Sequence, residues 1–323
     1  MRATLTCVSV AFLVALFILT TSTFAQTAPS PRDAFIESGD NAYASGNYRV
    51  ALMVYTESCR YGSTTACVRA GDTLEAGVYN DVAGEFSPSL EYYNEACRLD
   101  DPIGCARGAV FYDQYRAQCS DDDGTVTDPG ACIELGRGYA FGHGGLEIDK
   151  AKAETEFKKA CAVNDARGCY NLGSLYYEGL SGEPNGDLAE AALEKSCNLE
   201  YGPGCSLLGT VYVDGLVEGR DESDATLMWD RGCTQGDLET CMFLGEAYAE
   251  TPEIEGSGAA AVYYYELGCR ASHHASCRAL AYALVKGELV PQNKPVAREL
   301  FDRLCEAGDV PVCNSRYLFD ETE

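Results

Sequence analysis

The feature that most constrains this chain is a pair of cysteines that returns at a fixed interval. Five pairs have seven residues between their cysteines, and each pair begins 36 residues after the previous one. These pairs are Cys161/Cys169, Cys197/Cys205, Cys233/Cys241, Cys269/Cys277 and Cys305/Cys313. A fixed period of this length is typical of repeat proteins, in which each repeat is one small structural unit.

Other residue types follow the same period. Alanine stands eight residues before each first cysteine, a bulky residue stands four before it, and leucine stands three residues after the second cysteine of four pairs. The alanines are Ala153, Ala189, Ala225, Ala261 and Ala297, and the leucines are Leu172, Leu208, Leu244 and Leu280. Spacings of three and four residues place side chains on one helix face. Each repeat therefore predicts one helix that ends near the first cysteine and another that starts near the second.

Glycine and tyrosine rows add detail. Gly173, Gly209 and Gly245 directly follow three of the leucines. Because glycine disfavours a helix interior by about 1 kcal/mol relative to alanine, its return predicts close helix packing at this position. Between the cysteines, Gly202, Gly236 and Gly308 are predicted to adopt the left-handed conformation that ends a helix, and Asp165, Asp237 and Asp309 to cap the next helix or stabilise its turn.

The repeat extends toward the N-terminus with one interruption. Cys59/Cys67 and Cys97/Cys105 keep the seven-residue spacing, but Cys119 and Cys132 have 12 residues between them, including the acidic stretch "SDDDGT". A helix pair of this length cannot bury its own apolar face, whereas stacked copies can. We therefore predict an all-α solenoid over residues 33–323, with a shortened, irregular unit at 105–132.

The first 25 residues have the features of a secretory signal peptide. Arg2 precedes an apolar run that ends at Leu19, and the small residues Thr23 and Ala25 predict cleavage between Ala25 and Gln26. Residues 26–32 are then a short linker. Removal of Cys7 leaves an even 16 of the 17 cysteines, which favours disulfides in an oxidising compartment, the periplasm or the exterior. The apolar run is short for a membrane span, an uncleaved anchor being the alternative interpretation, and no span is predicted in the chain that remains after cleavage.

The predicted mature chain is strongly acidic. Loss of Arg2 leaves 23 basic residues against 50 acidic residues, a net charge of about −27. Such a surface repels nucleic acid and anionic lipid, and it suits cations or basic partners.

The motifs "CYNLGSLYYEG" and "DLAEAALEKSC" resemble Sel1-like repeats, which are relatives of the tetratricopeptide repeat. The 36-residue length with paired cysteines resembles the Helicobacter cysteine-rich protein family in particular. The resemblance covers about residues 33–315 and implies a right-handed solenoid of helix hairpins, each fastened by one disulfide. The implied pairs are Cys59–Cys67, Cys97–Cys105, Cys119–Cys132, Cys161–Cys169, Cys197–Cys205, Cys233–Cys241, Cys269–Cys277 and Cys305–Cys313. The pattern constrains the Cys119–Cys132 pair least.

Metal and redox roles for the cysteines are weaker interpretations. Structural zinc sites use closer cysteine spacing and more ligands per site, and no C-x-x-C motif is present. The alternative is a metal or haem site at His273 and His274, which lie inside one cysteine pair. No metal or cofactor is predicted.

Catalytic motifs give little support for an enzyme. The sequence lacks the S-x-x-K, S-D-N and K-T-G motifs of serine β-lactamases and the G-x-S-x-G motif of esterases, so no catalytic residue is predicted. A β-lactamase-like or penicillin-binding hydrolase is an alternative that rests only on the resemblance, because some relatives have been described in that way. Fold analogy alone is weak evidence for function.

The preferred function is an exported interaction module that binds a protein or peptide, with a basic partner as the candidate, on its concave face. Two rows of the second helix point away from the predicted core. The first comprises Ser174, Thr210, Glu246 and Tyr282, and the second Glu178, Asp214, Glu250 and Lys286. Stacking would align the acids into a ladder. The candidate binding residues are Glu178, Asp214, Glu246, Glu250 and Tyr282, and the alternative is a solvated acidic face without a partner.

Overall fold

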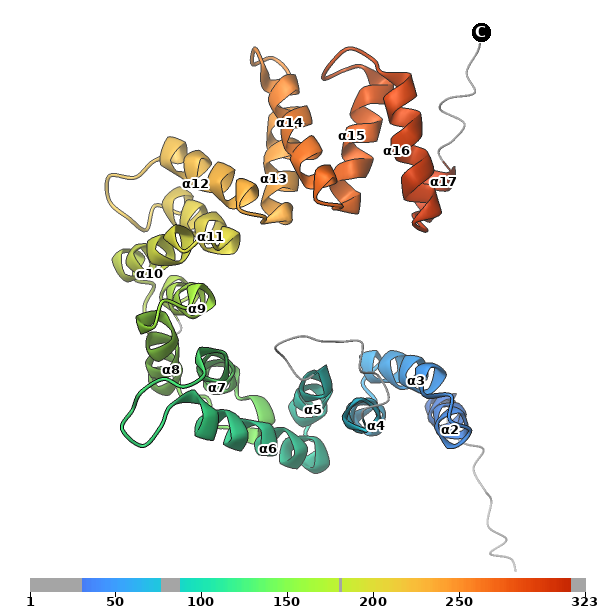
Figure 1. The fold of residues 1–323 in the computed structure, drawn as a ribbon, viewed down its shortest axis with the longest axis vertical. Helices are drawn as coiled ribbons and strands as arrows, with labels where there is room; N and C mark the ends of the chain where they lie inside the picture. Colours follow the sequence, from blue (N-terminus) through green and yellow to red (C-terminus); the bar gives the residue numbers. More distant parts are fainter. Residues whose placement is uncertain (1–30, 77–87, 180–181, 315–323) are drawn as a thin grey trace, which may run out of the picture. The chain divides into compact units, whose positions relative to one another are not determined.

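The computed structural model describes residues 31–76, 88–179 and 182–314, which are almost entirely α-helical (Figure 1). Among these residues, β-structure is confined to one isolated bridge between Ser120 and Val126. The predicted signal peptide and its cleavage site at Ala25 and Gln26 lie outside the described residues. The predicted linker 26–32 lies mostly outside them, but residues 31 and 32 belong to the first turn of a helix.

The chain divides into two compact units, up to Gly108 and from Ala109, where the sequence analysis expected one continuous solenoid. The first unit contains α2 (Pro31–Ala44), α3 (Tyr48–Arg60), α4 (Thr64–Glu75), α5 (Pro88–Arg98) and the start of α6 (Pro102–Cys119). The second contains the end of α6, α7 (Pro129–Phe141), η1 (His143–Gly145), α8 (Lys150–Ala162), α9 (Ala166–Tyr177), α10 (Gly186–Asn198), α11 (Gly202–Val213), α12 (Glu222–Thr234), α13 (Leu238–Ala249), α14 (Ser257–Arg270), α15 (His274–Lys286), α16 (Lys294–Glu306) and α17 (Val310–Asn314).

Within the second unit, two helix types alternate. We call α9, α11, α13 and α15, which carry the second cysteine of a pair, the A helices. We call α8, α10, α12, α14 and α16, which carry the first cysteine, the B helices. Each B helix packs against the helices that precede and follow it in the chain; these are A helices except for α7, before α8, and α17, after α16. The predicted succession of helix pairs is confirmed, and with it the all-α repeat fold class.

The periodic rows form the core of this unit. The five alanines of the alanine row are fully buried, and the four leucines of the leucine row are at most 8 % exposed. The glycine row explains how the helices approach so closely. A Cβ atom added to Gly209 would lie 2.7 Å from Trp229 Cδ1 on α12, and one added to Gly173 would lie 2.5 Å from Leu193 Cγ on α10. The interpretation of these glycines as packing positions is confirmed.

Disulfides join each B helix to the helix that follows it. In the structure all eight cysteine pairs are local, with Cα atoms 4.4–4.9 Å apart. A hairpin turn holds the two helix ends at a separation that suits a disulfide. The bonds therefore fasten the hairpins without linking distant repeats.

The turn between the cysteines differs in part from the sequence prediction. Gly236 and Gly308 have φ of 94° and 91°, as expected, but Gly202 is the first residue of α11 and is not left-handed. In the pairs with seven residues between their cysteines, the left-handed residue stands three positions after the first cysteine, and Asn164, Glu200 and Ser272 fill this place in other repeats. The prediction for Gly202 is wrong because Gly202 lies two residues after the left-handed position, which Glu200 occupies in this repeat.

Polar caps begin the helices. Asp149, Asn185 and Asn293 each accept a hydrogen bond from the backbone N–H three residues later, and Asp221 forms a capping box with Asp224. These caps stand at multiples of 36 residues from one another and start the B helices. They form a row that the sequence analysis did not use, although the period alone would have revealed it.

The irregular segment contains a single helix, α6, in which both ends carry a disulfide. Cys105 near its start pairs with α5, and Cys119 at its end pairs with Cys132 of α7. Elsewhere in the repeats these two roles belong to two separate helices. One helix therefore takes the place of two here, and the turn that follows α6 is longer than the turns of the other cysteine pairs.

Candidate functional site

Neighbouring A helices contact each other in two pairs, α9 with α11 and α13 with α15. Residues of α9, α11 and α13 also line one groove, so these helices share a surface. At about 100° per residue, positions five and nine residues after the second cysteine point away from the buried leucines. Glu178, Asp214, Glu246 and Glu250 occupy such positions and are all exposed. We call Glu178, Asp214 and Glu250 the acid row.

Each member of the acid row is the residue that ends an A helix, α9, α11 or α13. The carbonyl groups at a helix C-terminus carry partial negative charge, so a carboxylate there is unfavourable by about 0.3–1 kcal/mol at low ionic strength. Among the described residues, no cationic side chain forms an ion pair with any of the three. The acid row is therefore not explained by local stabilisation of these helices.

Hydrogen bonds orient two members of the row. The Tyr177 hydroxyl of α9 donates to Asp214 Oδ2 at 2.7 Å, and the Ser174 hydroxyl donates to Glu178 Oε1 at 3.0 Å. The bond to Asp214, followed by burial, raises the pKa of Tyr177 above its ordinary value. The first of these bonds links two repeats, so the C-terminal ends of α9 and α11 lie side by side.

The two rows end in the last repeat with Tyr282 and Lys286, which differ from the acids at these positions in the repeat before it. Tyr282 is only half-exposed, and its ring packs edge-on against Phe301 of α16, with ring centres 5.2 Å apart. The expectation that this position lies away from the core is wrong for Tyr282, because a long aromatic side chain can reach back to the neighbouring B helix. Lys286 takes the place of the acid in this repeat.

A groove of about 300 Å³ lies on the same surface, toward the N-terminal ends of the A helices. Its aromatic walls come from Tyr170 of α9, Trp229 of α12 and Phe243 of α13, and the Trp229 and Phe243 rings meet edge to face at 5.0 Å. The remaining lining residues are Pro203, Ser206, Leu207, Thr210, Asp237 and Thr240. Thr210 was placed on this surface by its row, but the aromatic residues were not predicted as a site, since they belong to different rows.

Asp237 faces this groove instead of capping its helix. In the equivalent position, Asp165 accepts hydrogen bonds from the backbone N–H groups of Arg167 and Gly168 and so caps α9. Asp237 makes no such cap; its Oδ2 instead lies 2.9 Å from the Thr240 hydroxyl. Thr240 occupies the position that Gly168 occupies two repeats earlier. Its hydroxyl contacts the Asp237 carboxylate, which does not cap the helix backbone.

Tyr170 is electrostatically connected to both features. Burial first, then the neighbouring Tyr201, Asp237 and Glu178, raises the pKa of the Tyr170 hydroxyl. The negative charges of the groove and of the acid row therefore act on one aromatic side chain. Tyr170 lines the groove together with Asp237, and it belongs to the same helix, α9, that ends at Glu178.

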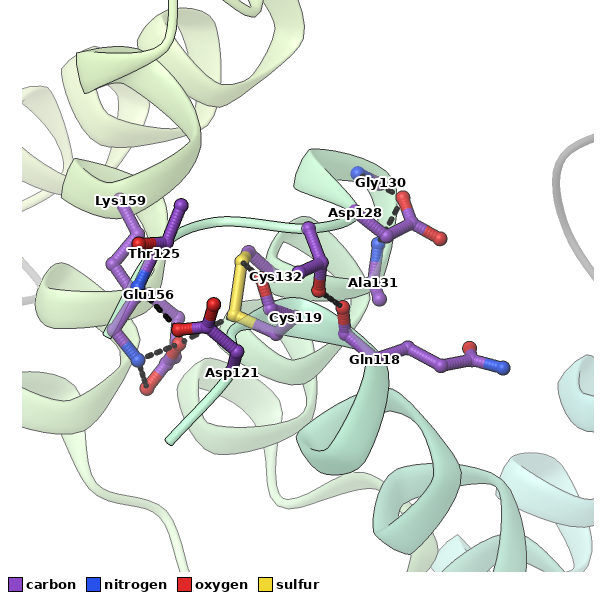
Figure 2. The surroundings of a disulfide bond; sticks show 11 residues. Gln118, Cys119, Asp121, Thr125, Asp128, Gly130, Ala131, Cys132, Glu156 and Lys159 are labelled. Carbon is purple, nitrogen blue, oxygen red and sulfur yellow. Dashed lines mark hydrogen bonds and ion pairs between the residues drawn. A yellow bond between two sulfur atoms is a disulfide. The ribbon is translucent and has the colours of Figure 1, made fainter. Parts of the chain in front are cut away.

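A buried carboxylate lies against the irregular disulfide (Figure 2). Glu156 of α8 is 9 % exposed, its Oε2 lies 3.2 Å from Cys119 Sγ, and Lys159 Nζ pairs with it at 2.8 Å. Among the described residues, Cys119, Cys132 and Glu156 are the only group of three with the spacing of metal ligands. Because the two sulfur atoms are bonded to each other, they are not available as thiolate ligands while the disulfide is intact.

The turn that carries His273 and His274 does not form a group of metal ligands in the described part of the chain. His273 is the residue that precedes α15, its Nδ1 lies 2.8 Å from the Ser276 hydroxyl, and its Nε2 lies 3.4 Å from Glu239 Oε1. His274 is exposed and lines a separate groove of about 620 Å³ between α14 and α16. The metal or haem alternative therefore gains no ligand set from the structure.

Within the residues described, no helix is both long and apolar enough to cross a membrane. Together, the alternating A and B helices, the local disulfides and the acidic surface define a disulfide-fastened repeat scaffold. Comparisons with known proteins agree with this class. Residues 129–165, 166–201, 239–273 and 274–309 match the Sel1 repeat family. The chain therefore contains four Sel1 repeats, and Sel1 repeats are generally protein-interaction modules.

Solved structures of other Sel1 repeat proteins are distantly similar. A Sel1 repeat protein from Oxalobacter formigenes is 20% identical, with a TM-score of 0.45 over 84% of this chain and 99% of that one. A protective antigen of uropathogenic Escherichia coli with the SLR fold is 19% identical, with a TM-score of 0.45 over 84% of this chain and 61% of that one. No curated protein matches the chain.

Between residues 129 and 309, one repeat escapes the family match. Residues 202–238 are not matched, yet they form the helix pair α11 and α12 and keep the Cys197–Cys205 and Cys233–Cys241 disulfides at their ends. The middle of the aromatic groove lies on this pair. The local sequence thus departs from the family where the groove is formed.

Proposed function

We propose that this protein is an exported interaction module that binds a basic protein or peptide on the surface formed by its A helices. The acid row is the observation that carries the proposal. Three carboxylates stand at helix C-termini, where the helix dipole opposes them, and none has a cationic partner among the described residues. Residues that violate a local stability rule are often retained for function.

Other features support an exported binding role. Eight disulfides fit a compartment outside the reducing cytosol, in agreement with the predicted signal peptide. A solenoid surface built from successive A helices offers an extended site for a peptide. We propose this surface as the concave face expected from the sequence.

A peptide array tests this proposal. The mature, disulfide-bonded protein is applied to peptides in which lysine, arginine, glutamate and neutral residues vary, at low salt and at 0.3 M NaCl. We expect basic peptides to bind best, and salt to weaken binding because exposed charges are screened over about 10 Å or less. Replacing Glu178, Asp214 and Glu250 with alanine should weaken binding roughly tenfold, since exposed ion pairs contribute about 0.2–1 kcal/mol each.

The matched control replaces three exposed acids of the B helices, Glu194, Glu222 and Glu299, with alanine. This variant has the same net charge as the acid-row variant, so any difference between them reports the position of the charges. Equal binding by both variants, or a preference for acidic peptides, would contradict the proposal. The hydrolase alternative gains no further support from the residues described here.

A further inference from the structure

The aromatic groove has walls and charge that suit one kind of side chain. Tyr170, Trp229 and Phe243 present ring surfaces from three different helices, and no lysine, arginine or histidine lines the groove. Phe243 is 48% exposed although it is a large apolar residue, so its ring is available at the mouth. Aromatic faces attract the cationic groups of arginine and lysine and pack against their apolar stems.

The carboxylate of Asp237 supplies the charge at one side of this groove. Thr240 is 92 % buried, and its hydroxyl lies 2.8 Å from the Ser206 hydroxyl and 2.9 Å from Asp237 Oδ2. This chain of side chains holds the carboxylate toward the groove. Asp237 has neither a helix-capping bond nor an ion-pair partner among the described residues. The arrangement therefore leaves a fixed negative charge beside three aromatic rings.

We propose that the groove binds the side chain of an arginine or lysine from an extended peptide, with its stem between the rings and its cation at Asp237. The volume of about 300 Å³ is at the lower end for ligand pockets and suits one long side chain. This inference rests on the proposed function, because it specifies which part of a basic partner the A-helix surface recognises.

Thr210 connects the groove to the acid row and so indicates the path of a bound peptide. Thr210 lines the groove and lies four residues before Asp214 on the same face of α11. A peptide whose basic side chain occupies the groove can continue along α11 toward the acid row. The groove then selects one residue of the partner, and the acid row attracts its remaining positive charge.

The protein's single tryptophan makes the groove directly observable, because Trp229 is its wall. The probes are acetyl-Ala-Ala-Arg-Ala-Ala-amide and the same peptide with citrulline, which keeps the shape of arginine without its charge. We expect the arginine peptide to change the Trp229 fluorescence saturably and the citrulline peptide to bind about tenfold more weakly. A lysine peptide should resemble the arginine peptide.

Two variants test the assigned side chains. Asp237→Asn keeps the size of the side chain and should remove the preference for arginine over citrulline. Phe243→Ala shortens an exposed ring and should weaken both peptides. Glu194→Gln, on the B helix α10, is the matched charge control and should bind as the wild type does. Circular dichroism and the melting temperature establish that each variant is folded.

Each outcome decides between the two proposals. Equal affinity for arginine and citrulline, a better-bound apolar peptide, or unchanged binding by Asp237→Asn would overturn the assignment of the groove. If the acid-row variant still weakens basic peptides in that case, the proposed function stands without the groove. If neither the groove variants nor the acid-row variant changes binding, both proposals fail.

Discussion

Gly209 shows how a single missing side chain permits close packing. The space for its Cβ is occupied by the Trp229 ring and by the Ala225 carbonyl oxygen, 2.9 Å away. The ring can shift, but the backbone carbonyl of α12 is fixed by its helix. The same close approach recurs at Gly136, Gly173 and Gly245, each against a bulky residue of the next helix.

We therefore expect Gly209→Leu to lower the free energy of unfolding by about 1–3 kcal/mol, because the added atoms overpack this contact. The control is Ala247→Leu, at an exposed position of α13 where a larger side chain meets solvent. Chemical denaturation of both variants measures the effect. An unchanged or higher stability of Gly209→Leu would show that Gly209 is not a packing position.

Buried tyrosines make the fold sensitive to alkali. The Tyr55 hydroxyl donates to Asp40 Oδ1 at 2.6 Å, and burial, followed by this bond, raises the pKa of Tyr55 to about 12. An unfolded tyrosine has a pKa near 10. The folded-state pKa is the higher one, so this contribution to stability is complete below pH 10 and is lost as the pH rises from 10 toward 12.

Denaturation midpoints measured between pH 8 and pH 12 should accordingly fall above pH 10. Tyr55→Phe removes the titrating hydroxyl and should make this fall smaller. Parallel pH profiles for the wild type and the variant would contradict the assigned role of Tyr55. Tyr93 and Tyr212 also have pKa values raised by burial and by a carboxylate, so part of the fall should remain.

At the scale of the element, the unit of construction is the hairpin of a B helix and the next A helix. Its two helix ends carry one disulfide, and the residue three positions after the first cysteine turns the chain with a positive φ. The chain-entropy view assigns roughly 2–3 kcal/mol to the closure of so short a loop. The hairpin is therefore fastened independently of its neighbours.

Non-reducing peptide mapping should find eight local disulfides and no unpaired thiol in the mature protein. Cys119–Cys132 is the informative pair, because its longer turn is organised by local polar contacts: Asp121 Oδ1 accepts from the backbone N–H of Thr125 at 2.8 Å, and Asp128 caps α7 (Figure 2). A disulfide between different repeats would contradict the local pairing.

At the scale of the whole molecule, charge is the dominant feature. The sequence contains 50 acidic and 24 basic residues, a net charge of −26. Many acids are compensated by local pairs such as Arg98 with Glu95 and Arg220 with Glu190, whereas no ion pair within residues 31–76, 88–179 and 182–314 involves the acid row. Self-repulsion should therefore oppose folding at low ionic strength.

Adding NaCl from 10 mM to 300 mM should raise the melting temperature, because salt screens repulsion between exposed carboxylates. The acid-row variant, with three fewer negative charges, should show a smaller increase. A melting temperature that falls with salt in this range would mean that ion pairs outweigh the repulsion. This measurement needs no partner and is independent of both binding proposals.

The sequence by itself determined the helix pairs, the buried rows and the acid row. These features depend on spacing along one helix, where a residue's position fixes the face it occupies. The same reasoning failed at Gly202, because a turn residue is defined by backbone conformation and residues as different as Asn164, Glu200 and Gly236 adopt it. It also missed the packing of Tyr282, since a long side chain can reach a neighbouring helix.

Only the tertiary structure decided the aromatic groove. Tyr170, Trp229 and Phe243 belong to different rows and different helices, so no period in the sequence brings them together. Their convergence depends on how α9, α11, α12 and α13 stack, and the orientation of Asp237 depends on a hydroxyl of its own helix that in turn contacts α11. Local periodicity specifies faces, whereas a binding site requires the distances between faces, which packing alone sets.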